Sequence, residues 1–231
     1  MATQRQTNKK IRWLTDKIKL LVYVLFPAAT AWAGNAKIQN NETKAKITPD
    51  SLRKKWTGII AVYDNDSIGK MVDELYTSES QRLNILTGKG SSLLAATGFA
   101  ISLISLTFAI GKELLNHLSL ISPIAAFILL FFTTTSVIYF VVTAFCATKV
   151  VRVSQINQLT TTDFTTICCD YETDKNNIKK KWTLEKLVTV DLNHKILLVK
   201  SNWLDASQGS FLRGVFCFSI AFLALFFSLL V

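Results

Sequence analysis

The stretch Leu93-Leu-Ala-Ala-Thr-Gly-Phe-Ala-Ile-Ser-Leu-Ile-Ser-Leu-Thr-Phe-Ala-Ile-Gly111 and the second apolar run at Ile124–Cys146 decide the fold of this chain. The runs have 19 and 23 residues, and Lys112 and Glu113 are the only formally charged side chains between positions 93 and 147. Since a helix needs about 20 apolar residues to cross the hydrocarbon core, these runs predict a hairpin that crosses a membrane twice. A chain of 231 residues is too short to bury two such helices on all sides in a soluble domain.

A third apolar run, Gly214–Val231, predicts one more membrane helix. The expected fold class is therefore an all-α membrane protein, a two-span helical hairpin plus a C-terminal span, with cytoplasmic helical segments before and after the hairpin. The expected divisions are an N-terminal cytoplasmic segment with interfacial or amphipathic helices, the transmembrane hairpin, a cytoplasmic helical segment and the C-terminal transmembrane helix. They cover residues 1–92, 93–147 (spans about 93–111 and 124–146), 148–210 and 211–231. No ionisable residue is expected near mid-membrane.

The charge distribution predicts the orientation. The net charge is +10, with six Lys or Arg in residues 1–33, nine in 34–92, one in the hairpin turn and ten after residue 147. Because basic segments stay on the cytoplasmic side, residues 1–92 and 148–210 are expected in the cytoplasm and the turn 112–117 in the periplasm of an inner-membrane protein.

The run Leu20–Gly34 imitates a signal peptide, with a basic lead and a small-x-small pattern at Ala31-Trp32-Ala33. Export of the chain would place both basic blocks outside, which the charge rule opposes. The run is also short and contains Pro27. It is interpreted as an interfacial or buried helix, and insertion or cleavage remains an alternative.

Local signals divide the polar segments. Thr48 before Pro49 predicts a helix start, and 58–63 is either a short strand or a buried helical turn. An amphipathic helix from Ser67 is expected to stop at a hinge, Thr87–Gly90. The second span is expected to continue to about residue 159, followed by a Thr160–Asp163 cap and a short helix over 164–172. A long amphipathic helix is expected from position 179 to about 208, ahead of the third span.

Two of the predicted spans carry stripes of small residues at alternating spacings of three and four. Such stripes let membrane helices approach closely, so they are interpreted as faces in contact, within one chain or between copies. The first stripe is Ser91, Ala95, Gly98, Ser102, Ser105 and Ala109, and the second is Gly214, Cys217, Ala221, Ala224 and Ser228.

The second span has a hydroxyl face near its middle, formed by Thr133, Ser136 and Thr143 around Phe140. Such hydroxyls either bond back to their own helix and pack or line a polar path between assembled helices. Both interpretations stay open from the sequence.

No pattern of catalytic, cofactor-binding or metal-ligating residues is found, so neither an enzyme nor a cofactor is expected. Cys168 and Cys169 are adjacent, which suits neither a zinc site nor a disulfide framework. The lysine triplet Lys179, Lys180 and Lys181 is a candidate contact for a partner or a lipid headgroup, and a solvated helix face is the plainer alternative.

The layout resembles a family of small membrane effectors of bacterial anti-phage systems. The likeness lies in a basic cytoplasmic segment, a helix with Gln81-Arg-Leu83 and Lys89, a tight hairpin, a lysine- and asparagine-bearing helix and an apolar tail, mainly over 79–111 and 182–231. It covers about half of the chain and includes SLATT-like two-span effectors and retron-associated transmembrane effectors. The resemblance implies an inner-membrane protein that a partner holds silent and that compromises the membrane on infection, causing abortive infection. No functional residue of the family is matched by motif in this sequence.

The resemblance leads to one leading hypothesis and two alternatives. The leading hypothesis is a retron-linked effector that oligomerises when active and resides in membrane lipid. Its expected partners are a reverse transcriptase and its RNA–DNA hybrid, or another gating protein. The alternatives are a membrane anchor or scaffold subunit that recruits a soluble partner, and an effector gated by a cyclic nucleotide.

Overall fold

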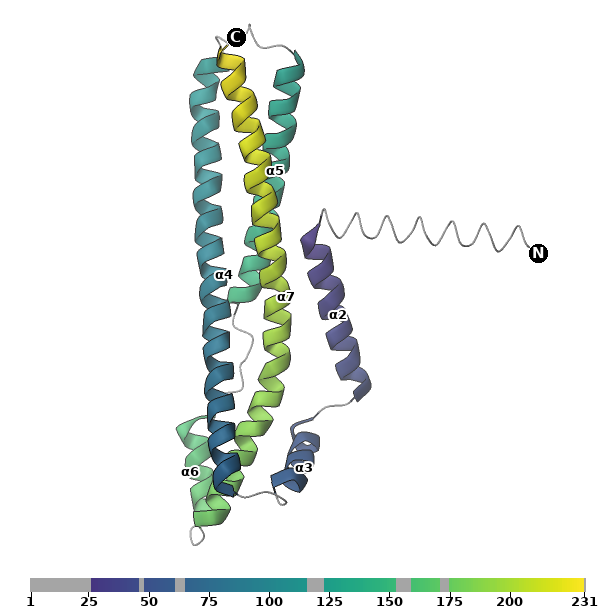
Figure 1. Ribbon diagram of the computed structural model, residues 1–231, viewed down its shortest axis with the longest axis vertical. Helices are drawn as coiled ribbons and strands as arrows, with labels where there is room; N and C mark the ends of the chain where they lie inside the picture. The colour runs from purple at the N-terminus through teal and green to yellow at the C-terminus, as the bar shows by residue number, and fades with distance from the viewer. Residues whose placement is uncertain are drawn as a thin grey trace, which may run out of the picture. The chain divides into compact units, whose positions relative to one another are not determined.

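The computed structural model describes residues 26–45, 48–60, 65–115, 123–152, 159–170 and 175–230 (Figure 1). Within these ranges it has six helices and no strand, in agreement with the expected all-α class. The chain divides into two compact units. The membrane unit comprises Met1–Ala33, Lys89–Lys149 and Asn202–Val231, and the polar unit comprises Gly34–Gly88 and Val150–Ser201.

Helix α2 spans Pro27–Ala45 and α3 spans Pro49–Ile60. Each begins with proline, whose missing N–H is one that a first helical turn leaves unbonded in any case. Thr48 and Ser51 cap the predicted start of α3. The Thr48 N–H donates to the Ser51 hydroxyl at 3.0 Å, and the Ser51 N–H donates to the Thr48 hydroxyl at 3.2 Å. The ambiguous segment at 58–60 is the last turn of α3, and positions 20–25 and 61–64 lie outside the described residues.

Helix α4 is one continuous helix from Asn65 to Leu115. The hinge expected at Thr87–Gly90 is wrong, as is a hairpin turn beginning at Lys112. A glycine within a helix costs only about 1 kcal/mol relative to alanine, and no proline interrupts α4 to remove a backbone bond. Gly90 is buried and lies within the continuous helix.

Helix α5 spans Pro123–Val151 and α6 spans Thr161–Asp170. The expected extension of the second span to residue 159 is wrong, since α5 ends eight residues earlier. The predicted cap before α6 is present as a reciprocal box, in which the Thr160 N–H donates to Asp163 Oδ2 at 2.7 Å and the Asp163 N–H donates to Thr160 Oγ1 at 3.3 Å. The Thr160 N–H and the Thr160 hydroxyl, which donates to the same Oδ2 at 2.7 Å, lower the pKa of Asp163, and the backbone N–H has the larger effect.

Helix α7 runs without a break from Lys175 to Leu230, so the expected cytoplasmic helix and third span form one element of 56 residues. Within the described residues, three helices, α4, α5 and α7, contain segments long and apolar enough to cross a membrane. The outward side chains of the membrane unit fit that solvent, since large apolar groups on α5 such as Phe127, Leu130 and Val141 are more than half exposed. These observations support a multi-pass membrane protein.

In the polar unit, α3 and the adjoining parts of α4 and α7 enclose a small core of Ile60, Val72, Leu184 and Leu187, with Trp56 and Ile68 packed against it. The parts of α4 and α7 in this unit lie side by side, as the ion pair of 2.6 Å between Lys186 Nζ and Asp73 Oδ1 shows (Figure 1). Helix α6 is fastened to α7 by an edge-to-face contact of Phe164 with Trp182.

Candidate functional site: a helix seam in the membrane unit

Two cross-helix hydrogen bonds join α5 to α7 in the membrane unit. The Ser136 hydroxyl donates to the carbonyl of Gly214 at 2.8 Å, and the Ser207 hydroxyl donates to the carbonyl of Thr143 at 3.1 Å. The bonded positions are seven residues apart on each helix and run in opposite directions, so these bonds fix the register of an antiparallel pair. Both serines are fully buried, so the seam between α5 and α7 is a specific interface rather than non-specific apolar packing.

Phe140 fills the middle of this seam. Its ring lies against Gly214, where an added Cβ would be 2.9 Å from Cε1, and its centroid is 5.7 Å from that of Phe211. The residue is 1 % exposed. A side chain at position 214 would therefore force the ring out of its place, and the absence of a side chain on Gly214 is what allows the helices to approach here.

Toward the other end of the seam, Cys146 and Ala206 pack with Ala31 of α2, and Phe145 meets Trp203 edge to face. The first turns of α2 in the membrane unit are therefore part of the same interface. The sequence predicted a buried or interfacial helix here, and Ala31 is buried while Trp32 is 68 % exposed.

The three hydroxyl residues predicted on the second span, Thr133, Ser136 and Thr143, are all buried in α5. Thr133 donates to the carbonyl of Leu129 at 2.7 Å and Thr143 to that of Tyr139 at 2.8 Å, both within α5. With Ser136 bonded across the seam, the hydroxyl groups of this face donate to backbone carbonyls. The face is closed in this conformation.

One further hydroxyl lies in the membrane unit without such a bond. Ser210 of α7 is fully buried, and its Oγ has no hydrogen-bond partner among the described residues. It lies between Ser207 and Gly214, on the face of α7 that packs in the seam.

The two predicted small-residue stripes have different surroundings. On α7, Gly214, Cys217 and Ala221 are buried and Ala224 is partly buried. The side chain of Ser228 lies outside the described residues. This stripe continues toward the N-terminus through Ser207 and Ser210, which sequence reasoning left out because the predicted span began later.

On α4 the predicted stripe faces outward. Ser91, Ala95, Gly98, Ser102 and Ser105 are all exposed, and nothing lies within 4 Å of a Cβ built on Gly98. The side chain of Ala109 lies outside the described residues. Among the described side chains of this span, Thr97 and Ile104 are buried, and they point to another side of the helix.

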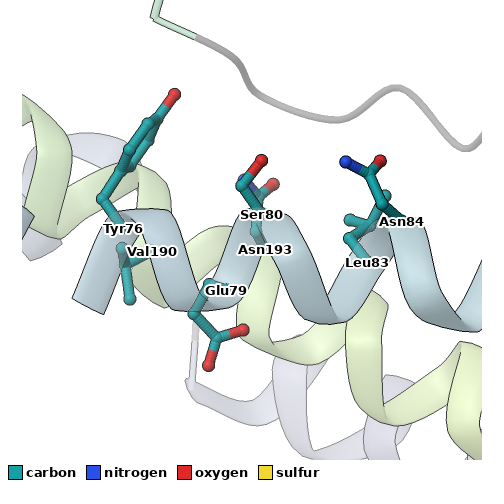
Figure 2. A pocket seen from close by; sticks show the side chains of 7 residues that line it. All are labelled: Tyr76, Glu79, Ser80, Leu83, Asn84, Val190 and Asn193. Atoms are coloured by element: carbon teal, nitrogen blue, oxygen red, sulfur yellow. The ribbon is translucent and has the colours of Figure 1, made fainter. Parts of the chain in front are cut away.

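The polar unit contains a buried carboxylate that the sequence did not single out. The Oε1 atom of Glu79 lies 3.3 Å from Arg82 Nη1 and 3.7 Å from His194 Nδ1, while Oε2 is buried with no hydrogen-bond partner among the described residues. Glu79 borders a cavity of about 40 Å³, enough for one water molecule. In Figure 2, Tyr76, Ser80 and Asn84 extend to one side of α4 and Glu79 to the other.

Helix α3 is held on α7 in the polar unit by an ionic pairing. Arg53 donates to both carboxylate oxygens of Glu185, at 3.0 Å from Nε and 3.2 Å from Nη2, and the Trp56 indole N–H donates to Asp191 at 3.1 Å. The bond to Glu185 raises the pKa of Arg53. The bidentate pair of Arg53 with Glu185 and the bond from Trp56 together define one docking position for α3 on α7.

The predicted lysine triplet lies on α7, in the polar unit. Lys181 is 3.9 Å from Glu185, and Lys179 and Lys180 are exposed. Within the described part of the chain, no group of three or more His, Cys, Asp or Glu side chains is placed to hold a metal ion. No protein-family model, curated protein or solved structure matches this chain.

Proposed function

We propose that this protein is a membrane effector of a bacterial antiviral defence system, retron-linked, that is held inactive by a partner and disrupts the inner membrane on phage infection. Its active form is an oligomer, and its action leads to abortive infection. The partners are the reverse transcriptase and RNA–DNA hybrid of a retron, or another gating protein. Residues 1–92 and 148–210 lie in the cytoplasm and the hairpin turn in the periplasm.

The observation that carries this proposal is the uncovered small-residue face of α4. In lipid, helices associate by close backbone approach, because burial of apolar surface gives no advantage over lipid tails. The matching face of α7 is used within the chain, against α5. The face with Ala95, Gly98 and Ser102 has the same character and is exposed, and nothing lies within 4 Å of a Cβ built on Gly98, which suits a second copy.

The closed seam supports the idea of a silent state. Phe140 is buried between α5 and α7, and the hydroxyls of Ser136 and Ser207 are bonded to backbone carbonyls across the seam. The docked helix α3 supplies an element that a partner in the cytoplasm can hold or release, since it is held on α7 by ion pairs as well as by a small apolar core.

Induction of the protein without its genomic neighbours tests this function. We expect loss of membrane potential, entry of a membrane-impermeant dye and growth arrest, all relieved by co-expression of the gating partner. Intact potential and growth at verified membrane levels would count against the proposal. Reporter fusions at residues 60 and 180 are expected to place both positions in the cytoplasm.

A second candidate is a membrane anchor that recruits a soluble protein. It is favoured by large apolar side chains on α4 in the polar unit, where Met71 is 69 % and Ile85 is 55 % exposed. An anchor is harmless when expressed alone, and an unrelated membrane segment can replace its membrane unit without loss of function. An effector is toxic when expressed alone, and it loses its function when its membrane unit is replaced.

A further inference from the structure

We infer that Arg213 forms an anion site inside the bilayer, which takes small inorganic anions such as chloride or phosphate and gives the membrane path of the assembled protein a preference for anions. The inference rests on the proposed function for its account of the path. The binding site itself rests on the register of α5 and α7.

The register gives Arg213 its depth. Arg213 directly precedes Gly214 on α7, and Gly214 is bonded to Ser136 of the antiparallel helix α5. Arg213 is therefore level with Val137. The apolar run Ile124–Cys146 extends 13 residues to one side of Val137 and nine to the other, or roughly 20 and 14 Å of helix. With α5 across a membrane, the Cα of Arg213 lies near the middle of the hydrocarbon core.

At this depth Arg213 would be an exception to the expectation that no ionisable residue lies near mid-membrane. In the sequence, Arg213 stands immediately before the uncharged run Gly214–Val231 and looks like a residue at the membrane edge. The antiparallel contacts show that α7 enters the level of the second span well before Gly214, since Ala206 already packs with Cys146.

The guanidinium remains within the apolar layer. Nη1 of Arg213 donates to the carbonyl of Gly209 at 2.7 Å, so the side chain turns back by one helical turn. Gly209 is level with Val141, five residues inside the end of the apolar run at Cys146, which corresponds to about 8 Å. An arginine at this depth is unfavourable by about 3 kcal/mol or more unless it meets a partner or water.

The described residues around Arg213 supply no compensating negative charge. No carboxylate of the described residues lies within 4 Å of it, and the bond to Gly209 is its only hydrogen bond among them. Pro27 of α2 lies on one side of the Arg213 guanidinium. Both groups border Gly209, since a Cβ built there would lie 3.3 Å from Pro27 Cγ and 3.0 Å from Arg213 Nη1. The positive end of α2 begins here and has the same sign as the guanidinium.

The remaining N–H donors of the guanidinium are thus available to an anion. Arg213 is only partly buried and lies beside the seam residues Ser210 and Gly214, so a ligand can reach it from outside the protomer. A fixed positive charge in a region of low dielectric attracts anions and repels cations strongly, and rings of arginine or lysine select anions in membrane pores.

The binding test uses the purified full chain in zwitterionic detergent and the ³⁵Cl⁻ linewidth as the probe. We expect a saturable broadening that Arg213→Gln removes and Arg213→Lys retains. Lys149→Gln, which removes a cation at the end of α5, serves as the matched control and should retain it. Broadening that does not depend on Arg213 overturns the inference. So does Arg213-dependent retention of phosphatidylglycerol without chloride binding, because the partner is then a lipid headgroup.

The permeation test uses the same proteins in phosphatidylcholine bilayers under a KCl gradient. The wild-type protein should show a reversal potential shifted toward the equilibrium potential of chloride. Arg213→Gln should lower the chloride-to-potassium permeability ratio by about tenfold. An unchanged reversal potential overturns the selectivity role. Chloride binding without any conductance would overturn the proposed function and the selectivity role but leave the anion site standing.

Discussion

A Cβ atom on Gly214 would lie 2.9 Å from Cε1 of Phe140, closer than carbon atoms in a folded protein approach. This contact joins the middle of α5 to α7, directly beside the bond from Ser136 to the Gly214 carbonyl. A glycine and a phenylalanine thus form the tightest point of the seam, and its closure depends on both.

Gly214→Ala is expected to destabilise the seam by about 1–3 kcal/mol, the usual range for overpacking a filled interior. Unfolding of the purified protein in detergent, followed by circular dichroism, measures this loss. Under the proposed function the same variant raises the basal leak of dye. The double variant Gly214→Ala with Phe140→Leu should recover much of the stability, because leucine leaves room for the added methyl group. A Gly214→Ala protein as stable as the wild type would show that the ring does not occupy the seam.

Ser136→Ala is expected to lower stability by about 0.5–1.5 kcal/mol, because the Gly214 carbonyl loses its cross-helix donor. Ser219→Ala is the matched control, since the Ser219 hydroxyl is exposed and donates at 2.9 Å to the carbonyl of Val215 in its own helix. The control should change stability little. Equal effects of the two substitutions would contradict a specific role of the cross-helix bond.

Gly98→Leu on α4 is expected to leave the stability of the single chain unchanged, because nothing lies within 4 Å of the new Cβ. It should nevertheless reduce cross-linking between copies in the membrane and relieve toxicity, since the leucine keeps two helices apart. Phe99→Leu, at an exposed position beside the stripe, serves as the control. Undiminished cross-linking and toxicity of Gly98→Leu would remove this face from the interface between copies.

Arg53→Glu should loosen α3 from α7 in the polar unit, because it replaces the forked bond to Glu185 with repulsion. Arg53 is partly exposed, so the loss is about 1 kcal/mol or less. Faster hydrogen exchange of residues 49–60 measures it. The double variant Arg53→Glu with Glu185→Arg restores the pair with its charges exchanged and should restore protection. If α3 is equally protected in the wild type and both variants, the apolar contacts of Leu52, Trp56 and Ile60 hold it alone.

The sequence predicted those parts of the fold that depend on local chemistry. The apolar runs gave the membrane-spanning helices, and Thr48 with Pro49 and Thr160 with Asp163 gave two helix starts that the structure confirms. The hinge at Thr87–Gly90 was wrong, because two glycines are a statistical signal of a break and not a physical barrier to a helix. The end of α5 at Val151 could not be located, since the polar residues beyond it are compatible with continued helix.

The candidate site shows the same division. Spacing alone identified the small residues of α4 and α7 and the hydroxyl face of α5, but the two stripes have the same pattern in the sequence. Which of them packs within the chain depends on how α7 rotates against α5. The buried Glu79 was passed over because a lone glutamate on an amphipathic helix normally faces water, and only the packing of α7 beside it removes that water.

The sequence by itself determined that this chain is helical, that three of its segments suit a lipid solvent and where several helices begin. Composition and spacing suffice for these features because each reflects interactions within one segment or between one segment and its solvent. The tertiary structure decided the position of Arg213 level with Val137 of α5, the contact of Phe140 with Gly214 and the exposure of the α4 stripe. These depend on the register and rotation of helices that are distant along the chain, which hydrogen bonds such as that of Ser136 fix and hydropathy does not encode.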